Sequence, residues 1–235
     1  MRIDLNADVG EGCGDDAALL HIVTTANVAC GAHAGNRATM EATIRAALAS
    51  GAAVGAHPSY PDRKNFGRVA MERTPAQIES DIVAQLDELS SVADTLKARL
   101  LHVKPHGALY NVAARDRRVA DAISHAVRSY DPTLAVVGLA GGEQLESARA
   151  HGLRAVAEVF ADRRYRDDGT LVPRNEADAS IDEVDQAVAQ ALRFVEEGRG
   201  ETICLHGDGP HALDFARAIR GALEARGVVI ASFTA

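Results

Sequence analysis

The chain has 235 residues, of which 47% are hydrophobic and 25% are charged, so it can form an ordinary globular fold with a sizeable core. A net charge of −8 and only 4% aromatic residues argue against a nucleic-acid partner, which needs basic surface and stacking rings. Three cysteines without paired spacing, no leader and no apolar run of membrane-spanning length favour a cytoplasmic protein without disulfides and without a membrane partner.

Apolar, strand-like runs alternate with helical patterns along the whole chain. The runs are continuous rather than alternating, which is typical of parallel strands covered on both faces. They span residues 2–8, 25–30, 52–57, 99–106, 133–140, 154–161 and 202–207, with 228–233 as a candidate eighth strand. The pattern predicts one α/β domain over residues 1–235, a distorted (β/α) barrel with seven or eight parallel strands. A doubly wound open sheet is the alternative, and it would gather the ionisable residues at one switch point instead of at most strand ends.

The helices between these runs have recognisable ends. Thr74 and Gln77 have the spacing of a capping box at the start of a helix. Ser180 and Glu183 predict a second capping box, and Gly198 suits the left-handed position after that second helix.

Four of the strand-like runs end at a histidine beside glycine or proline, namely at His33, His57, His106 and His206. Imidazole transfers protons near neutral pH and is the commonest metal ligand. Because the active sites of parallel barrels lie at the carboxyl ends of the strands, the repeated position predicts one shared pocket.

The first strand brings Asn6 and Asp8 to the same face, since alternate residues of a strand point the same way. Polar groups there are costly to bury unless they bind something, so we expect a functional role for Asp8, which is also a hard metal ligand. The alternative is a carboxylate that caps the following turn. Further along, Arg68 is suited to hold a carboxylate, and a surface salt bridge is its alternative role.

The densest polar segment contains His102, Lys104 and His106 at alternate positions, which predicts that all three face one side. A lysine between two imidazoles is expected either to have a lowered pKa or to bind an anion.

Carboxylates and a basic cluster follow the sixth run. Glu158 and Asp162 alternate and should share a face, while Arg163 either binds a ligand or pairs with Asp162. After the seventh run, His206 and Asp208 lie in a glycine-rich turn that opens a helix and can bind an anion. The chain has no phosphate-loop motif, so nucleotide handling would be unconventional or carried by a partner.

These segments together resemble the LamB/YcsF family, the family of component A of the prokaryotic 5-oxoprolinase. The resemblance rests on residues 4–12, 27–35, 55–62, 66–68, 102–111, 158–165 and 205–210, which follow the family order. Cys13 and Ala32 depart from it, because phenylalanine is usual there. The resemblance implies a barrel like that of glycoside hydrolases and polysaccharide deacetylases. It also implies ATP-dependent opening of 5-oxoproline to L-glutamate in a complex with subunits B and C.

With that reaction in view, the catalytic residues are expected to be Asp8, His57, Lys104 and His106. Asp8 or His106 would activate water, and Lys104 would stabilise developing negative charge. The expected substrate-binding residues are Asn6, His33, Arg68, Tyr110, Glu158, Asp162, Arg163, His206 and Asp208, with Arg68 or Arg163 on the substrate carboxylate. ATP is the expected co-substrate, with or without Mg.

Two other functions stay open. A stand-alone metal-dependent amidohydrolase or deacetylase would use Asp8, His33 and His57 as ligands of a divalent ion that lowers the pKa of water. A non-catalytic binding barrel within a larger assembly is the third interpretation. The sequence leaves undecided whether this chain itself binds ATP, which subunit phosphorylates the lactam, and the oligomeric state.

Overall fold

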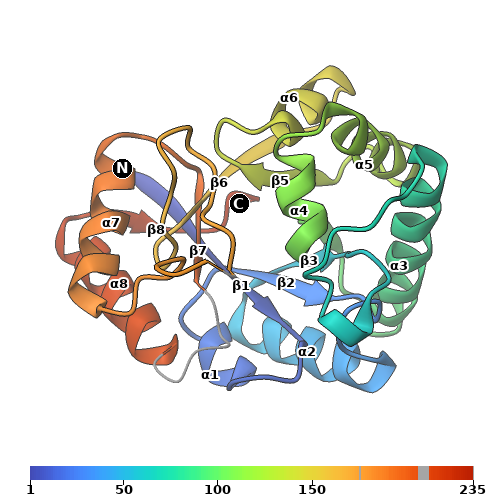
Figure 1. Ribbon diagram of the computed structural model, residues 1–235. Helices are drawn as coiled ribbons and strands as arrows, with labels where there is room; N and C mark the ends of the chain where they lie inside the picture. The colour runs from blue at the N-terminus through green and yellow to red at the C-terminus, as the bar shows by residue number, and fades with distance from the viewer. Residues whose placement is uncertain (175, 206–211, 235) are drawn as a thin grey trace.

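The computed structural model describes residues 1–174, 176–205 and 212–234, in which strands and helices alternate (Figure 1). The strands are β1 (Arg2–Val9), β2 (Thr25–Ala29), β3 (Ala53–His57), β4 (Leu100–Val103), β5 (Ala135–Leu139), β6 (Ala155–Phe160), β7 (Thr202–Leu205) and β8 (Val229–Ile230). The helices are α1 (Asp16–Leu20), α2 (Arg37–Ser50), α3 (Pro75–Thr95), α4 (Gly107–Ala113), α5 (Arg117–Tyr130), α6 (Glu143–Ala150), α7 (Val184–Glu196) and α8 (Ala212–Ala225), with a 3₁₀ turn at Arg63–Asn65.

The first seven strands close into a parallel barrel. Strand β1 pairs with β7 on one side and with β2 on the other, so the order β1 to β7 has no free edge. The short strand β8 pairs with the start of β1, outside the closed ring. The predicted barrel is therefore confirmed and the open sheet is wrong. A register shift between β3 and β4 accounts for part of the distortion.

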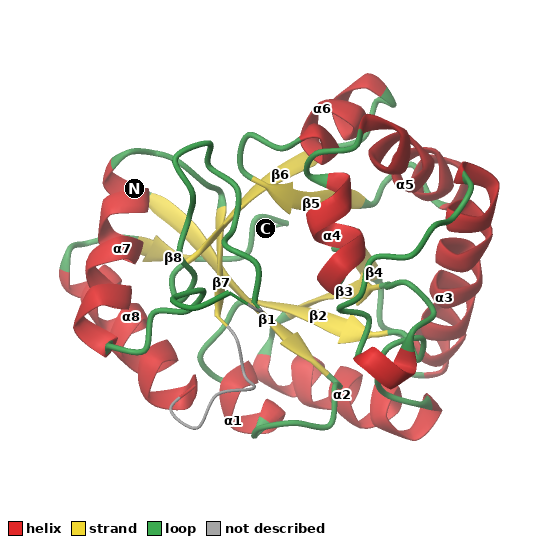
Figure 2. Cartoon of the chain, in the orientation of Figure 1, coloured by secondary structure: helices red, strands yellow, loops and turns green. Residues whose placement is uncertain are grey.

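The helices surround the strands (Figure 2), and the apolar core fills the space between the two layers. Helix α3 shows how the sequence produces this packing. Its residues Ile82, Leu86 and Leu89 recur at helical spacing, and all three side chains are fully buried. None of the described helices is both long and apolar enough to cross a membrane.

The helix-end predictions had mixed outcomes. The capping box at Thr74 is confirmed, because its hydroxyl accepts from the Gln77 amide while the Gln77 side chain accepts from the Thr74 amide. Gly198 has the expected positive φ of 62°. The capping box at Ser180 is wrong: α7 starts after Glu183, which makes no side-chain cap. Ser180 instead pairs antiparallel with Arg163, so its backbone belongs to the preceding segment.

Two segments at the carboxyl ends of the strands have irregular backbone pairing. The chain between β6 and α7 folds back on itself through antiparallel bridges, one of them between Tyr165 and Leu171. The run predicted as a strand over 99–106 pairs formally only to Val103. It nevertheless continues beside the chain after β3, since the Lys104 amide donates to Ala56 and the His106 amide to Pro58. Pro105, whose nitrogen points to the other side of the strand, has no amide hydrogen to donate there, and pairing with β5 ends at Val103.

Candidate active site

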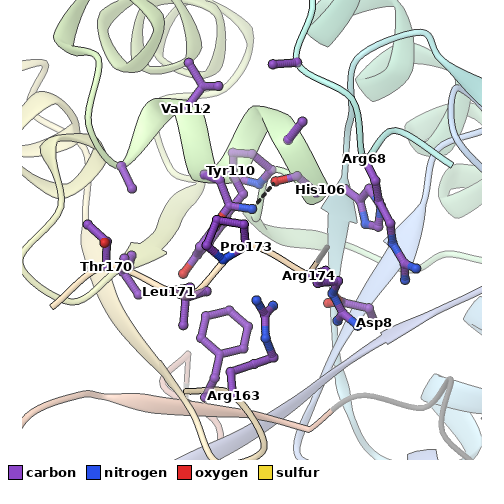
Figure 3. A pocket seen from close by; sticks show the side chains of 18 of the residues that line it. Asp8, Arg68, His106, Tyr110, Val112, Arg163, Thr170, Leu171, Pro173 and Arg174 are labelled. Atoms are coloured by element: carbon purple, nitrogen blue, oxygen red, sulfur yellow. Dashed lines mark hydrogen bonds between the residues drawn. The ribbon is translucent and has the colours of Figure 1, made fainter. Parts of the chain in front are cut away.

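A cavity of about 660 Å³ opens at the carboxyl ends of the strands (Figure 3). Its lining includes Asp8 from β1, His57 from β3, and Lys104 and His106 from the segment after β4. The expectation that ionisable strand-end residues meet in one pocket therefore holds for these four. His206 and Asp208 lie outside the described residues.

His57 has a fixed orientation. Its Nδ1 lies 2.7 Å from the carbonyl oxygen of Lys104, and because a carbonyl only accepts, Nδ1 carries the proton. Nε2 of the neutral ring is then an acceptor. It lies 3.2 Å from Oδ2 of Asp8 and 3.0 Å from Nδ1 of His106.

His106 is held in the complementary way. Its Nε2 donates to the carbonyl oxygen of Phe66 at 3.0 Å, which leaves Nδ1 facing the pocket. This contact depends on Gly107, because a Cβ there would lie 2.7 Å from the carbonyl oxygen of Gly67. Burial lowers the pKa of His106, although Glu11 acts in the opposite direction.

Glu11 completes the group, and the sequence patterns did not predict it. It follows Asp8 by three residues in a turn where Gly10 and Gly12 have φ of 76° and 78°. Its Oε1 lies 3.2 Å from Nδ1 of His106 and 3.1 Å from Nε2 of His33. Burial alone would raise the pKa of Glu11, but the neighbouring imidazoles of His106 and His33 outweigh it and hold the pKa below its usual range. The available signal was its position in the loop directly after a strand that ends in Asp8.

His33 lies behind this group instead of on the cavity wall. Its ring stacks on His106 with centroids 3.8 Å apart, and burial lowers its pKa to about 4. The metal ligands expected from the sequence, Asp8, His33 and His57, differ in part from the group that lies closest together. Within the described part of the chain, one ligand atom from each of Asp8, Glu11, His57 and His106 lies within 4.8 Å of the others.

Lys104 lies at the floor of the cavity with 2% of its surface exposed. Its Nζ lies 2.9 Å from Oδ1 of Asp8 and 2.8 Å from Oε1 of Glu158. Burial would lower its pKa, but the neighbouring negative groups outweigh it and raise the pKa well above the ordinary value. The expected lowering by two imidazoles is therefore wrong, since carboxylates dominate the surroundings of this ammonium group.

Asn6 and Glu158 belong to a buried network beneath the cavity and do not line it. The amide of Asn6 donates to Oε1 of Glu158 at 2.9 Å, and its carbonyl oxygen accepts from Lys104 at 3.2 Å. His102 also faces this interior, with Nε2 2.8 Å from the Asn27 side-chain oxygen. The inward direction expected for His102 and Lys104 is thus confirmed, and the network fixes the position of Lys104.

Several arginines also line the cavity. Arg163 is 4% exposed and donates to the backbone carbonyls of Ala179 and Val172. Burial, together with the nearby Arg174, lowers its pKa to about 10, so it stays charged at neutral pH. Figure 3 shows Arg163 and Arg174 directed into the pocket that Asp8 also lines. Arg68, Arg115 and Arg166 line the cavity as well, whereas Asp162 does not.

Tyr110, expected to bind substrate, lies on the cavity wall with its ring against Phe160. Its buried hydroxyl interacts with the neighbouring carboxylate of Glu158. Burial and the charge of Glu158 raise the pKa of Tyr110 well above its ordinary value. The hydroxyl therefore keeps its proton and can donate it to a bound molecule.

Comparisons with known proteins identify the family and the fold. The model of the LamB/YcsF family matches residues 3–235. A lactam utilization protein from Thermus thermophilus is 41% identical, with a TM-score of 0.93 over 99% of this chain and all of that one. A family 4 carbohydrate esterase from Streptomyces lividans is 16% identical over 97% of this chain and 91% of its own, with a TM-score of 0.53. The catalytic domain of a peptidoglycan N-acetylglucosamine deacetylase from Eubacterium rectale is 14% identical over 99% and 88%, with a TM-score of 0.52. The last two share the barrel fold.

Proposed function

This chain belongs to the LamB/YcsF family, and we propose that it opens the cyclic amide of 5-oxoproline to give L-glutamate. The observation that carries the proposal is one cavity lined both by an acid–base group and by several arginines. Such a cavity suits an amide that carries a carboxylate. The 41% identical relative, a lactam utilization protein, supports the same class of substrate.

We assign the substrate carboxylate to Arg163. Its guanidinium is buried and charged, lines the cavity, and donates hydrogen bonds to two uncharged carbonyls. A buried cation of this kind is stabilised by an incoming carboxylate, which would accept a charge-assisted hydrogen bond. Arg68 lies above the Phe66 ring, 4.9 Å from its centroid, and is the second candidate for this contact.

Hydrolysis also needs an activated water and a proton for the leaving nitrogen. His57 presents an unprotonated Nε2 beside Asp8, so this pair can accept a proton from water, and His106 lies close enough to share it. Tyr110 is the candidate proton donor, because its hydroxyl keeps its proton and its side chain lines the cavity.

Lys104 has a different role from the one expected. Its ammonium group is already surrounded by Asp8, Glu158 and Asn6, so it has little capacity to contact an oxyanion directly. We propose that it keeps Asp8 ionised and oriented, and that it is a positioning residue.

ATP is the proposed co-substrate, and phosphorylation of the lactam oxygen would activate the stable amide. Arg68 and Arg174 also line the cavity, and their positive charge suits a phosphorylated intermediate, whereas Arg166 pairs with Glu176 at 2.6 Å. The proposed assembly contains subunits B and C. Three free cysteines fit the proposed cytoplasmic location.

The test is to mix this chain with subunits B and C and to measure glutamate formed from 5-oxoproline, with and without ATP. We expect glutamate only when all the subunits and ATP are present. The proposal is wrong if the complete mixture forms no glutamate while each component is folded. As a control, Asp94→Asn at an exposed position of α3 should form glutamate as fast as the unmodified chain does.

A stand-alone metal-dependent amidohydrolase or deacetylase is the second candidate function. The observation that favours it is the group of two carboxylates and two imidazoles at the cavity. Amide hydrolysis by the isolated chain, without ATP and abolished by a chelator, would select this function over the first.

A further inference from the structure

Four acceptor atoms converge at the inner wall of the cavity. They are Oδ2 of Asp8, Oε1 of Glu11, Nε2 of His57 and Nδ1 of His106. His57 and His106 approach to 3.0 Å, and the carboxylate contacts measure 3.2 Å from Asp8 to His57 and 3.2 Å from Glu11 to His106. Acceptors at these distances repel one another unless a proton or a cation lies between them.

The backbone determines which ring atoms point inward. The carbonyl oxygens of Lys104 and Phe66 each require a proton on the outer nitrogen of the ring they contact, in His57 and His106 respectively. In the neutral rings, both inner nitrogens therefore present lone pairs to the same space. Protein metal ligands are commonly held in this way, with one nitrogen donating to a carbonyl and the other free for the metal.

The net charge of these four side chains also favours a bound cation. Asp8 and Glu11 contribute two negative charges, and the two imidazoles contribute none when neutral. The nearest cation, Lys104, also contacts the buried carboxylate of Glu158 at 2.8 Å, so these two charges offset each other. One divalent cation among the four acceptors would balance the remaining charge.

The spacing suits a small transition-metal ion. A tetrahedral ion with bonds of about 2.0–2.1 Å places its ligand atoms roughly 3.3 Å apart. The observed separations of 3.0 and 3.2 Å match this value, and the 3.9 Å between His57 and Glu11 is somewhat longer. Two imidazoles in the set favour zinc and its neighbours over magnesium and calcium, which prefer oxygen ligands alone.

The surroundings hold the carboxylates as well. Oδ1 of Asp8 accepts from Lys104 and Asn27 at 2.9 Å each, which leaves Oδ2 for the cluster. Glu11 accepts from His33 at 3.1 Å. All four members of the group line the cavity, so an ion there would be reachable by a water or a substrate oxygen.

From this geometry we propose that Asp8, Glu11, His57 and His106 bind one divalent transition-metal ion of the zinc class, with His33 holding Glu11 from behind. The ion would occupy the same His57 and Asp8 atoms that accept a proton from water in the proposed function, but the inference concerns this chain alone and does not depend on which amide is hydrolysed. The competing account is a single proton shared by the four acceptors.

The experiment uses the full chain after treatment with a chelator, without lactam, ATP or partner subunits. Zinc binding is measured by calorimetry, and Co²⁺ serves as a spectroscopic probe of coordination. We expect one ion per chain, release of protons on binding, and visible absorption bands of Co²⁺ characteristic of four-coordinate geometry. Absence of stoichiometric binding by either ion in the folded chain would overturn the proposal and support the shared proton.

Variants locate the ion. His57→Gln and Glu11→Gln should each weaken zinc binding by more than about 100-fold, since loss of a partner behind a ligand already costs 10–100-fold. His33→Gln should weaken it by roughly 10–100-fold and leave the cobalt bands in place. His125→Gln, at an exposed histidine of α5, is the matched control and should bind as the unmodified chain does. If all the variants bind equally, the ion sits elsewhere and the proposed site is wrong; circular dichroism confirms that each is folded.

Discussion

Replacing Lys104 by methionine removes the positive charge beneath the cavity while keeping a long side chain there. Its Nζ lies 2.9 Å from Asp8 and 2.8 Å from Glu158, and Lys104 itself is 2% exposed. Each contact corresponds to an attraction of about 6 kcal/mol at an effective dielectric constant of ~20, most of which offsets the cost of burying the charges. Removing one partner leaves Glu158 as a buried, uncompensated charge.

We therefore expect Lys104→Met to lower the free energy of unfolding by about 3–5 kcal/mol at pH 7. Urea titrations followed by circular dichroism would show this as a midpoint lowered by roughly 1–1.7 M, for a denaturant slope of about 3 kcal/mol/M. The double variant Lys104→Met with Glu158→Gln should recover most of the loss, because the stranded charge is gone. Lys64→Met, at an exposed lysine, should stay within about 0.5 kcal/mol of the unmodified chain.

Two results would refute this reasoning about Lys104. One is a single variant as stable as the unmodified chain, which would mean that Glu158 is neutral or solvated. The other is a double variant no more stable than the single one, which would attribute the loss to packing instead of charge.

Three further predictions concern stability and substrate binding. A Cβ at Gly55 would lie 2.2 Å from the buried His102 ring, so Gly55→Ala should lower the free energy of unfolding by about 1–3 kcal/mol in urea titrations. Gly221→Ala, in open space on a helix, should raise it by up to about 1 kcal/mol. Equal stabilities of the two variants would contradict the packing around His102. Burial lowers the pKa of His102 from 6.5 to about 3, so the unfolded chain binds a proton that the folded chain does not. Stability should therefore fall as the pH drops below 6.5, by about 2 kcal/mol between pH 7 and pH 5 from this group, and His102→Gln should reduce that slope; an unchanged slope would exclude His102 as its source. Arg163→Gln should raise the KM for 5-oxoproline by roughly 10–100-fold in the reconstituted complex, as expected for the loss of a charged hydrogen bond. Arg164→Gln, at an exposed position, should leave the KM unchanged. An unchanged KM in Arg163→Gln would show that Arg163 does not bind the substrate carboxylate.

The sequence was most informative where one physical rule acts on every element. Apolar runs in parallel strands need both faces covered, so their continuity located all seven strands of the barrel. The carboxyl ends of those strands share one rim, which is why Asp8, His57 and His106 could be placed together from the sequence alone.

Loops were harder, because their path depends on contacts distant in sequence. Glu11 was missed since it lies beyond the strand, and only the turn after Val9 brings it back over His106. Ser180 has the sequence of a helix cap, but pairing with Arg163 takes its backbone elsewhere. The raised pKa of Lys104 could not be predicted, because it depends on the 2.8 Å contact with Glu158. Strand order alone does not give the distance between two side chains inside a barrel.

The measurement that tests the central claim most directly is ATP-dependent glutamate formation from 5-oxoproline by the reconstituted complex carrying Asp8→Asn. Asp8 contacts both His57 and Lys104, so the loss of its charge should reduce turnover by at least about 100-fold while the far-ultraviolet circular dichroism is retained. Turnover equal to that of the unmodified complex would contradict the assignment of this cavity as the site where the lactam is opened.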